Sequence, residues 1–376
     1  MRSNYNKLGS YIRPVDERNS DGSLGEDNLY GISVTKDFIV THANLVGVTF
    51  DSYKVVAPKQ FAYIPDTSRR GDKIAISLNT TGEKIIVSSI CTVFEIVDED
   101  QLLPEYLMLW FMRPEFDRYA RFMSNGSARE VFDWDCMCGV ELPVPPLPEQ
   151  QKIVRDYQVI TDRIALLRKV NEIIEAQSFS IFEEATKNSI EKKSLKEYGK
   201  VLTGKTPSTD APEYYGNDVP FIKTPDMHDN LYVVSWESAL SKLGADSQSN
   251  KYLPPDSVIV SCIGANAGEV SLTSCEAQTN QQINAVITRF PRYIYCALKK
   301  SREELRALGD AGSTMININK SLFENFQIVS VERGVLEQVE KELTPLFSTV
   351  KNNLHEMVLL NKLTSLIMSR LSIGTI

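Results

Sequence analysis

The sequence predicts an α+β chain of two similar, strand-rich α/β globules related by a pseudo-twofold axis and separated by two long antiparallel helices. Two observations predict this fold. Short sequence motifs of the first half recur in the second half at an offset of 184 to 188 residues. A long stretch with heptad spacing also follows each copy. The paired positions are Leu8 and Leu195, Tyr11 and Tyr198, Gly71 and Pro255, Gly82 and Gly268, Asn125 and Ala311, and Leu147 and Val335. Two such units suit a target that also has two halves.

The first copy is expected to be a mixed globule. Residues 73–77 and 84–88 are short β-branched runs beside glycine-containing turns, which predicts two strands. Residues 105–123 carry apolar side chains near a 3.6-residue period, which predicts a helix. Pro114 lies inside this stretch, so we expect two short helices or a kink there, because proline removes a backbone N–H donor and clashes with the preceding turn.

A proline-rich segment, residues 142–148, leads into the first long helix as a stiff, extended entry. Residues 149–185 then place apolar side chains on alternating steps of four and three, which is a heptad seam. The end of the chain repeats the seam, and Pro345 is expected to kink the second helix near its start. The seam residues expected to join the two helices are Ile153, Ile160, Ile164, Leu167, Ile174, Leu343, Leu346, Val350, Met357 and Leu360.

These two helices are expected to pair with each other, antiparallel, as a coiled coil; the alternative is that each packs only on its own globule. Asn171 lies in the seam, and an asparagine there fixes register at a cost in stability. About 35 residues at ~1.5 Å per residue give a rod of roughly 50 Å. The predicted division is 1–145 for the first globule, 146–188 for the central helix, 189–332 for the second globule and 333–376 for the C-terminal helix.

Bulk composition excludes several classes of protein. No N-terminal stretch resembles a signal peptide and no run approaches a membrane span, so we expect a soluble, cytoplasmic chain with no membrane partner. Six cysteines and three histidines show no metal-ligand spacing, and no metal site is expected. The net charge of −8 does not favour nucleic-acid binding, although residues 69–73, 118–129 and 192–205 are locally basic.

The motifs give little support to catalysis by this chain. Residues 264–268 are glycine-rich but lack the Gly-Lys-Ser/Thr of a phosphate-binding loop. The methyltransferase motif Asn/Asp-Pro-Pro-Tyr/Phe is absent. A nuclease needs clustered carboxylates to hold Mg²⁺, and the tight cluster at residues 98–100 reads as an exposed turn. The chain is therefore expected not to be an enzyme.

The order of motifs resembles the specificity subunit of type I restriction–modification systems over essentially the whole chain. The most specific piece is Pro-Leu-Pro-Glu-Gln at residues 146–150, which resembles the junction of a target-recognition domain with a spacer helix. Thr-Pro-Ser at 206–208 with Tyr-Tyr-Gly at 214–216 resembles the start of a second recognition domain. One departure is that the second junction, residues 329–338, has lost the prolines.

The resemblance implies a non-catalytic protein that binds double-stranded DNA. Each recognition domain would read one half of a bipartite, asymmetric target, and the helix pair would set the unread gap and dock two methyltransferase subunits. S-adenosylmethionine would bind those partners, and ATP and Mg²⁺ would serve two further nuclease–translocase subunits; this chain would bind no cofactor. The runner-up is a scaffold or inhibitory protein that kept the duplicated architecture but lost DNA reading.

Polar and basic residues of loops are the candidate DNA contacts, because such groups reach base edges and phosphates. Gln281 and Gln282 carry amides able to pair with adenine, and a capping or turn role is the alternative. The candidates in the first domain are Thr35, Lys36, Arg69, Arg70, Asn79, Ser127 and Arg129. The candidates in the second domain are Lys205, Thr206, Ser208, Lys223, Thr224, Asn266, Asn280, Gln281, Gln282 and Ser313.

Overall fold

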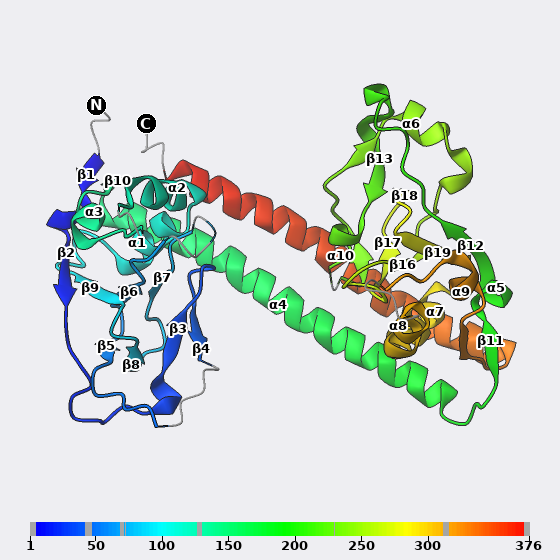
Figure 1. The fold of residues 1–376 in the computed structure, drawn as a ribbon, viewed down its shortest axis with the longest axis horizontal. Coiled ribbons are helices and arrows are strands. Elements are labelled where there is room, and N and C mark those ends of the chain that lie inside the picture. The colour runs from blue at the N-terminus through cyan, green and yellow to red at the C-terminus, as the bar shows by residue number, and fades with distance from the viewer. Residues whose placement is uncertain are drawn as a thin grey trace. The chain divides into compact units, whose positions relative to one another are not determined.

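The computed structural model describes residues 5–41, 47–67, 71, 73–125, 130–228, 230–310 and 316–371 (Figure 1). The chain forms two compact units, and both divisions between them fall inside long helices. The first unit runs to Asp162 and takes the end of the last helix from Lys362, while the second unit is Arg163–Asn361. The fold class is confirmed: each unit is a mixed domain of strands and helices, and a long helix follows each domain in the chain. The pseudo-twofold relation between them stays a prediction.

The first unit is built from short strands and three short helices before its long helix. Its strands are β1 (Tyr5–Lys7), β2 (Ile12–Val15), β3 (Tyr30–Ile32), β4 (Phe38–Val40), β5 (Lys54–Val56), β6 (Phe61–Tyr63), β7 (Ile76–Leu78), β8 (Ile85–Val87), β9 (Thr92–Ile96) and β10 (Glu141–Pro143). Its helices are α1 (Pro104–Phe111), α2 (Pro114–Met123), α3 (Trp134–Cys138) and the start of α4 (Leu147–Thr186).

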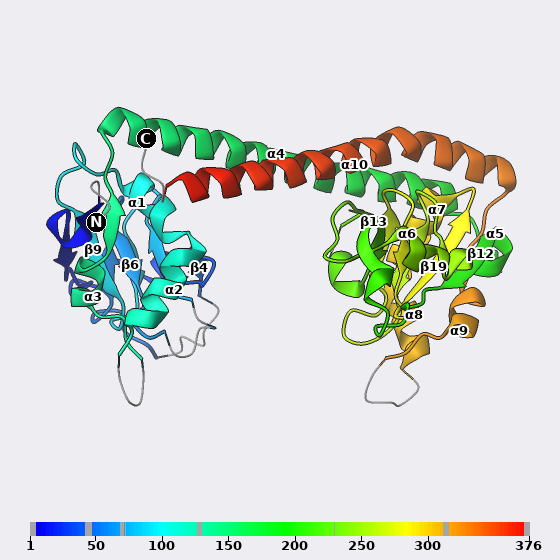
Figure 2. The same ribbon diagram turned by 90° about the horizontal axis from the view of Figure 1, so that it is seen from above.

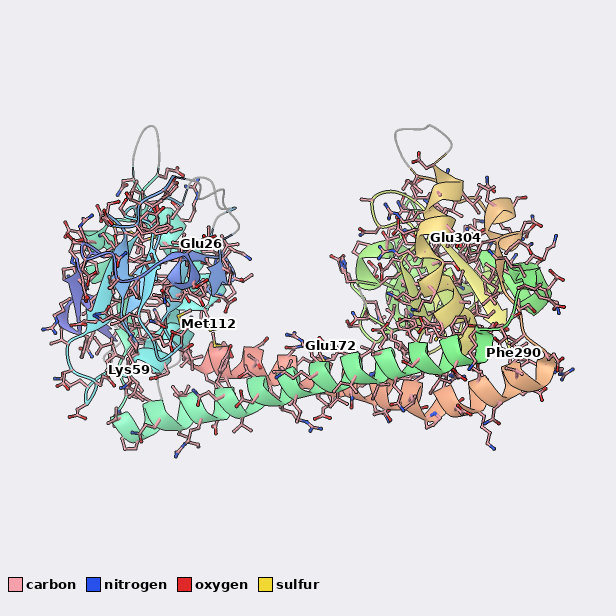
Figure 3. All side chains as sticks on the ribbon, turned by 90° about the horizontal axis from the view of Figure 1, so that it is seen from below. Glu26, Lys59, Met112, Glu172, Phe290 and Glu304 are labelled. Carbon is pink, nitrogen blue, oxygen red and sulfur yellow. The ribbon has the colours of Figure 1, made fainter. Side chains whose placement is uncertain are left out.

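An antiparallel sheet in the order β2-β9-β6-β7 forms the centre of this unit. Phe61 and Phe94 stack on it with ring centroids 4.8 Å apart, and Phe111 of α1 packs edge-on against both. The expected break at Pro114 is confirmed, since α1 ends at Phe111 and Pro114 opens α2. Met112, labelled in Figure 3, directly follows α1 and receives a hydrogen bond from the Tyr157 hydroxyl of α4 at 3.7 Å.

The second unit has longer strands and more helices. Its strands are β11 (Lys192–Ser194), β12 (Gly199–Thr203), β13 (Tyr215–Ile222), β14 (Tyr232–Val233), β15 (Ala239–Leu240), β16 (Val258–Ser261), β17 (Val270–Thr273), β18 (Gln278–Thr279), β19 (Ile283–Thr288) and β20 (Gln327–Val329). Its helices after α4 are α5 (Leu195–Tyr198), α6 (Lys242–Asp246), α7 (Pro291–Lys300), α8 (Arg302–Gly309), α9 (Lys320–Glu324) and α10 (Arg333–Arg370).

A five-stranded sheet in the order β12-β19-β16-β17-β14 is covered on both faces. Successive side chains of a strand point to opposite faces. Accordingly, Val258 and Val260 of β16 pack in the cluster that holds α7 and α10, whereas Ile259 packs with Ile222 of β13 on the other face. Strand β13 itself belongs to a second sheet in the order β15-β13-β18.

Both domains share one structural feature: the first strand of each pairs with its last strand. Strand β1 pairs antiparallel with β10 in the first unit, and β11 pairs antiparallel with β20 in the second. In both cases the first strand of the domain meets its last strand, and a long helix begins a few residues later, at Leu147 and at Arg333. The sequence repeat therefore corresponds to a structural repeat, in which the first and last strands of a domain pair and a long helix follows.

The long helices pair within the second unit, where Figures 1 and 2 show α4 and α10 side by side. Arg163 forms a two-bond ion pair with Glu356 (2.7 and 3.0 Å), and Asn353 donates a hydrogen bond from its amide to the Asn171 side chain at 2.7 Å. Residue numbers rise on one helix as they fall on the other, so the pair is antiparallel. Helix α10 runs unbroken through Pro345, and the kink expected at this proline stays a prediction.

The structure places the ten seam candidates at two levels of burial. Ile164, Leu167, Ile174, Leu343 and Val350 are buried. Ile153, Ile160, Leu346, Met357 and Leu360 are half-buried. Phe182, Phe347 and Leu354 are also buried and were missed, because each lies one position beside the strict four-and-three spacing.

Helix α10 is also fastened to the second domain by Glu340. The Glu340 carboxylate accepts hydrogen bonds from the backbone N–H groups of Arg292 and Tyr293, at the first turn of α7. The Arg292 guanidinium donates to Glu340 (3.0 Å) and to Asp256 (2.7 Å). Burial raises the pKa of Glu340, and the surrounding N–H donors oppose that shift. A carboxylate at a helix N-terminus is stabilised by the helix dipole.

Candidate nucleic-acid interface

Three loops of the second domain meet where β12, β13 and β18 end. The Lys205 N–H, just after β12, donates to the Thr279 carbonyl (2.9 Å), and the Asn280 N–H donates to the Ile222 carbonyl at the end of β13 (3.3 Å). Gly204 allows this approach, because an added Cβ would lie 2.1 Å from the Asn280 carbonyl oxygen. Residues far apart in the sequence are thus held together by the backbone.

The side chains at this junction form what we call the amide cluster: Thr206, Thr224, Asn280, Gln281 and Gln282. The Thr206 hydroxyl donates to Gln281 Oε1 at 2.6 Å. Asn280 Nδ2 donates to Gln282 Oε1 at 3.1 Å, and the Thr224 hydroxyl donates to the same oxygen at 3.5 Å. Gln281 is exposed and the other four are half-buried, so the cluster reaches the surface while its members hold one another in place. All five are sequence-predicted candidates.

The remaining described candidates of this domain lie outside the cluster. Lys205 and Ser208 are exposed on the loop after β12. Lys223 is half-buried, and its ammonium donates to the Ser238 hydroxyl at 2.8 Å. Lys205 and Ser208 are therefore accessible to phosphates, although the Ser208 hydroxyl oxygen accepts the Asp210 N–H at 3.3 Å, whereas Lys223 must leave Ser238 to reach a phosphate.

Asn266 is exposed at the tip of the loop between β16 and β17, and arginine anchors position this loop. Arg306 of α8 donates from one guanidinium nitrogen to the carbonyls of Ala265 (2.9 Å) and Ala267 (2.7 Å), on either side of Asn266. Glu269, at the base of the loop, forms ion pairs with α7 and α8. Sequence reasoning missed Arg306, since it lies 40 residues beyond Asn266 and no motif links the two.

In the first domain, Lys36 is buried rather than presented to DNA, with 5% of its surface exposed. Its ammonium pairs with the Asp117 carboxylate at 2.9 Å and also donates to the Phe111 carbonyl at the end of α1. Burial lowers the pKa of the Lys36 ammonium, and the bond to Asp117 opposes this. The prediction of a DNA contact is corrected: a buried charge needs its partner, so Lys36 has a structural role.

Asn79 is likewise buried, with 1% exposure. Its amide donates to the carbonyls of Val56 and Glu83, both at 2.8 Å, and its oxygen accepts the N–H and the hydroxyl of Thr81. The side chain closes the turn between β7 and β8, as asparagine commonly does. Its hydrogen-bonding groups are used inside the protein, which corrects the prediction for this residue too.

Thr35 is the described first-domain candidate that reaches the surface. It lies in the turn between β3 and β4, where its hydroxyl donates to the Asp37 carboxylate at 3.0 Å. Arg69, Arg70, Ser127 and Arg129 in this domain, and Ser313 in the second, lie outside the described residues.

Within the ranges that the structure describes, no three side chains of histidine, cysteine, aspartate or glutamate gather as they would around a metal ion. The described helices include none that is both long and apolar enough to cross a bilayer.

Comparison with known proteins assigns the family. A model of the type I restriction modification DNA specificity domain matches residues 10–176 and again residues 188–331. The chain belongs to this family. The first matched region begins just after β1 and reaches into α4, and the second contains the second domain with the amide cluster. The resemblance inferred from the sequence is confirmed.

Individual members of the family show similarity over most of this chain. The type I restriction enzyme HindI specificity subunit of Haemophilus influenzae is 30% identical over 74% of this chain, which spans only 61% of that relative's length. The MjaIX specificity subunit of Methanocaldococcus jannaschii is 23% identical over 74% of this chain and 70% of its own length. A crystal structure of the S subunit from M. genitalium matches 98% of this chain and 95% of its own, with a TM-score of 0.65 at 11% identity, which supports the fold.

Proposed function

We propose that this chain is the specificity subunit of a type I restriction–modification complex. Each domain reads one half of a bipartite, asymmetric target in double-stranded DNA. The observation that carries the proposal is the double match to a DNA specificity domain. The amide cluster supports it for the second domain, because it places several hydrogen-bonding side chains from three loops on one patch of surface.

In this proposal the chain is not itself an enzyme. The methyl group passes from S-adenosylmethionine to adenine on two methyltransferase subunits, and ATP- and Mg²⁺-dependent translocation and cleavage belong to nuclease–translocase subunits. This chain places the catalytic subunits at the target: its domains select the DNA sequence, and its helices hold the partner subunits beside the selected DNA.

The surface of α4 supports docking of the methyltransferase subunits on the long helices. Leu166 and Ile173 lie one heptad apart on the side of α4 that is not in the seam, and their exposures are 52% and 67%. Figure 3 marks Glu172, the exposed neighbour of Ile173 on this helix. An apolar row at seven-residue spacing is the pattern that packs against another helix.

The test of the function is a genome-wide map of N6-methyladenine. A methylation-free host would express this chain with a methyltransferase subunit of its own system, and a strain without the chain is the control. We expect a two-part motif with a constant unread gap only when the chain is present. A stable complex without any new motif would contradict the proposal and favour the scaffold or inhibitor function.

The docking surface has its own test. Leu166→Asp and Ile173→Asp together are expected to abolish co-purification of the methyltransferase subunit, because charges would replace apolar contacts. Since both side chains are exposed, the thermal unfolding of the isolated chain should change little. Normal assembly of the double variant would place the partners elsewhere.

A further inference from the structure

We propose that Gln281 and Gln282 act as paired hydrogen-bond donors that read keto bases, guanine or thymine, in the half-site of the second domain. The inference rests on the proposed function and adds to it the chemical class of base that one position of this domain selects. It follows from the way in which the amide cluster orients the two side chains.

The backbone fixes the orientation of Gln282. Its N–H, which can only donate, bonds to the Asn280 side-chain oxygen at 3.2 Å. The Asn280 amide nitrogen must then be the atom that faces Gln282, and it donates to Gln282 Oε1 at 3.1 Å. The Thr224 hydroxyl donates to the same oxygen. An amide oxygen has two lone pairs, so both are engaged inside the protein.

What remains of Gln282 is its amide nitrogen with two N–H donors. Among the residues that the structure describes, none accepts a hydrogen bond from this nitrogen. A half-buried amide with unused donors at the surface is suited to an external acceptor, because leaving such donors unpaired in an interface costs free energy.

Gln281 repeats the arrangement one residue earlier. The Thr206 hydroxyl holds its Oε1 at 2.6 Å, toward the loop after β12, and the side chain as a whole is exposed. Its amide nitrogen likewise has no acceptor within the described part of the chain. Gln282 thus has both lone pairs of its oxygen engaged inside the protein, whereas Gln281 has one engaged by Thr206, and both side chains carry N–H groups that no described residue accepts.

This arrangement changes the base that the pair selects. A glutamine that pairs with adenine accepts from the N6 amino group and donates to N7, and therefore needs its oxygen free. Guanine presents O6 and N7 in the major groove, and thymine presents O4, all of which are acceptors. The expectation of adenine recognition from residue type alone is therefore replaced by recognition of an oxygen-bearing base edge.

The test replaces the donor by an acceptor of the same shape. Gln282→Glu and Gln281→Glu keep an oxygen for Asn280, Thr224 and Thr206 but present a second oxygen where the N–H groups were. In the methylation map, each variant is expected to change one position of one half-site from guanine to adenine or from thymine to cytosine. In competition binding by the complex with the methyltransferase subunits, the preference at that position should reverse by about ten-fold or more.

Gln327→Glu is the matched control. It adds the same charge to the second domain at an exposed position on β20, outside the amide cluster, and should leave the motif unchanged. If both cluster variants kept the wild-type motif, or moved it no more than the control does, the inference would be overturned while the specificity function stood. If the wild-type protein gave no methylation motif, the result would contradict both the inference on base class and the proposed specificity function.

A second measurement does not depend on the variants folding. Wild-type complex is tested on duplexes in which each guanine of the second half-site is replaced in turn by 2-aminopurine, which lacks O6, and each thymine by 5-methyl-2-pyrimidinone, which lacks O4. A roughly ten-fold loss of binding at one or two adjacent positions supports the inference. Undiminished binding at every position overturns it.

Discussion

At the residue scale, Lys36 is a buried charged side chain whose removal should destabilise the first domain. Its ammonium joins the turn between β3 and β4 to both α1 and α2, and its partner Asp117 also receives the N–H of Ile74. Lys36→Met removes the charge and leaves Asp117 without its cation, so we expect the free energy of unfolding to fall by about 3 kcal/mol. Urea unfolding of the purified chain measures it.

Thr35→Ala is the control for this variant, because Thr35 is the exposed neighbour in the same turn. It should change stability by less than about 0.5 kcal/mol. If Lys36→Met left stability unchanged and weakened DNA binding instead, the ammonium would have to leave Asp117 for a phosphate, and the structural role assigned here would be wrong.

Residue type and loop position predicted the members of the amide cluster but not their orientation. Thr206, Thr224 and Gln282 are brought together by backbone contacts between strands whose pairing no local pattern specifies. The same reasoning chose Lys36 and Asn79, where burial decides otherwise. A polar residue in a loop can face the solvent or the protein interior. Its tertiary partners decide between the two, and here they are Asp117 for Lys36 and Val56 for Asn79.

At the scale of elements, the seam and the outer face of α4 should respond differently to the same substitution. Ile164 is 6% exposed, and aspartate there would bury an unpaired charge. We expect Ile164→Asp to lower the free energy of unfolding by more than about 3 kcal/mol. Leu166→Asp, two residues away and exposed, should leave it nearly unchanged. Equal effects in calorimetry would mean that the seam is wrongly assigned.

The contact between α10 and α7 gives a second prediction at this scale. Glu340→Gln keeps an acceptor for the N–H groups of Arg292 and Tyr293 but sets an amide against the Arg292 guanidinium. The free energy of unfolding should fall by about 2 kcal/mol, as expected for a hydrogen bond to a charged group. Glu342→Gln, exposed on the same helix, is the control and should unfold like wild type.

Elements with a strong local signal could be predicted, and those fixed by distant contacts could not. The split at Pro114 and the long α4 follow from proline chemistry and a heptad pattern. The pairing of β1 with β10, or of β11 with β20, depends on strands more than 130 residues apart in the chain. The heptad pattern missed the buried residues Phe347 and Leu354, each one position beside the predicted seam. A helix that packs on a domain as well as on a partner helix buries a wider stripe than the seam alone.

At the scale of the whole molecule, the expectation that the long helices set the unread gap makes a quantitative prediction. Seven residues inserted at matched positions of α4 and α10 add about 10.5 Å at 1.5 Å per residue and nearly restore the helical phase. That length is about three base pairs at 3.4 Å each. The methylation map should show both half-sites unchanged and the gap longer by about that amount.

The same seven residues placed in the exposed turn at Gly22 are the control, since they leave both helices untouched. The gap should then stay as in wild type. A wild-type gap after insertion into both helices would show that something other than their length sets the spacing, and a change of bases in either half-site would contradict the independence of the two domains.

The turn between β18 and β19 has a consequence for how such a system could evolve. A single-nucleotide change in a codon converts glutamine to glutamate, and at Gln281 or Gln282 the exchange preserves the internal contacts that hold the turn. A lineage could thus acquire a new target in one mutational step, with no loss of fold. The same step would leave the host chromosome unmodified at every new site, so the change could spread only where methylation outpaces cleavage.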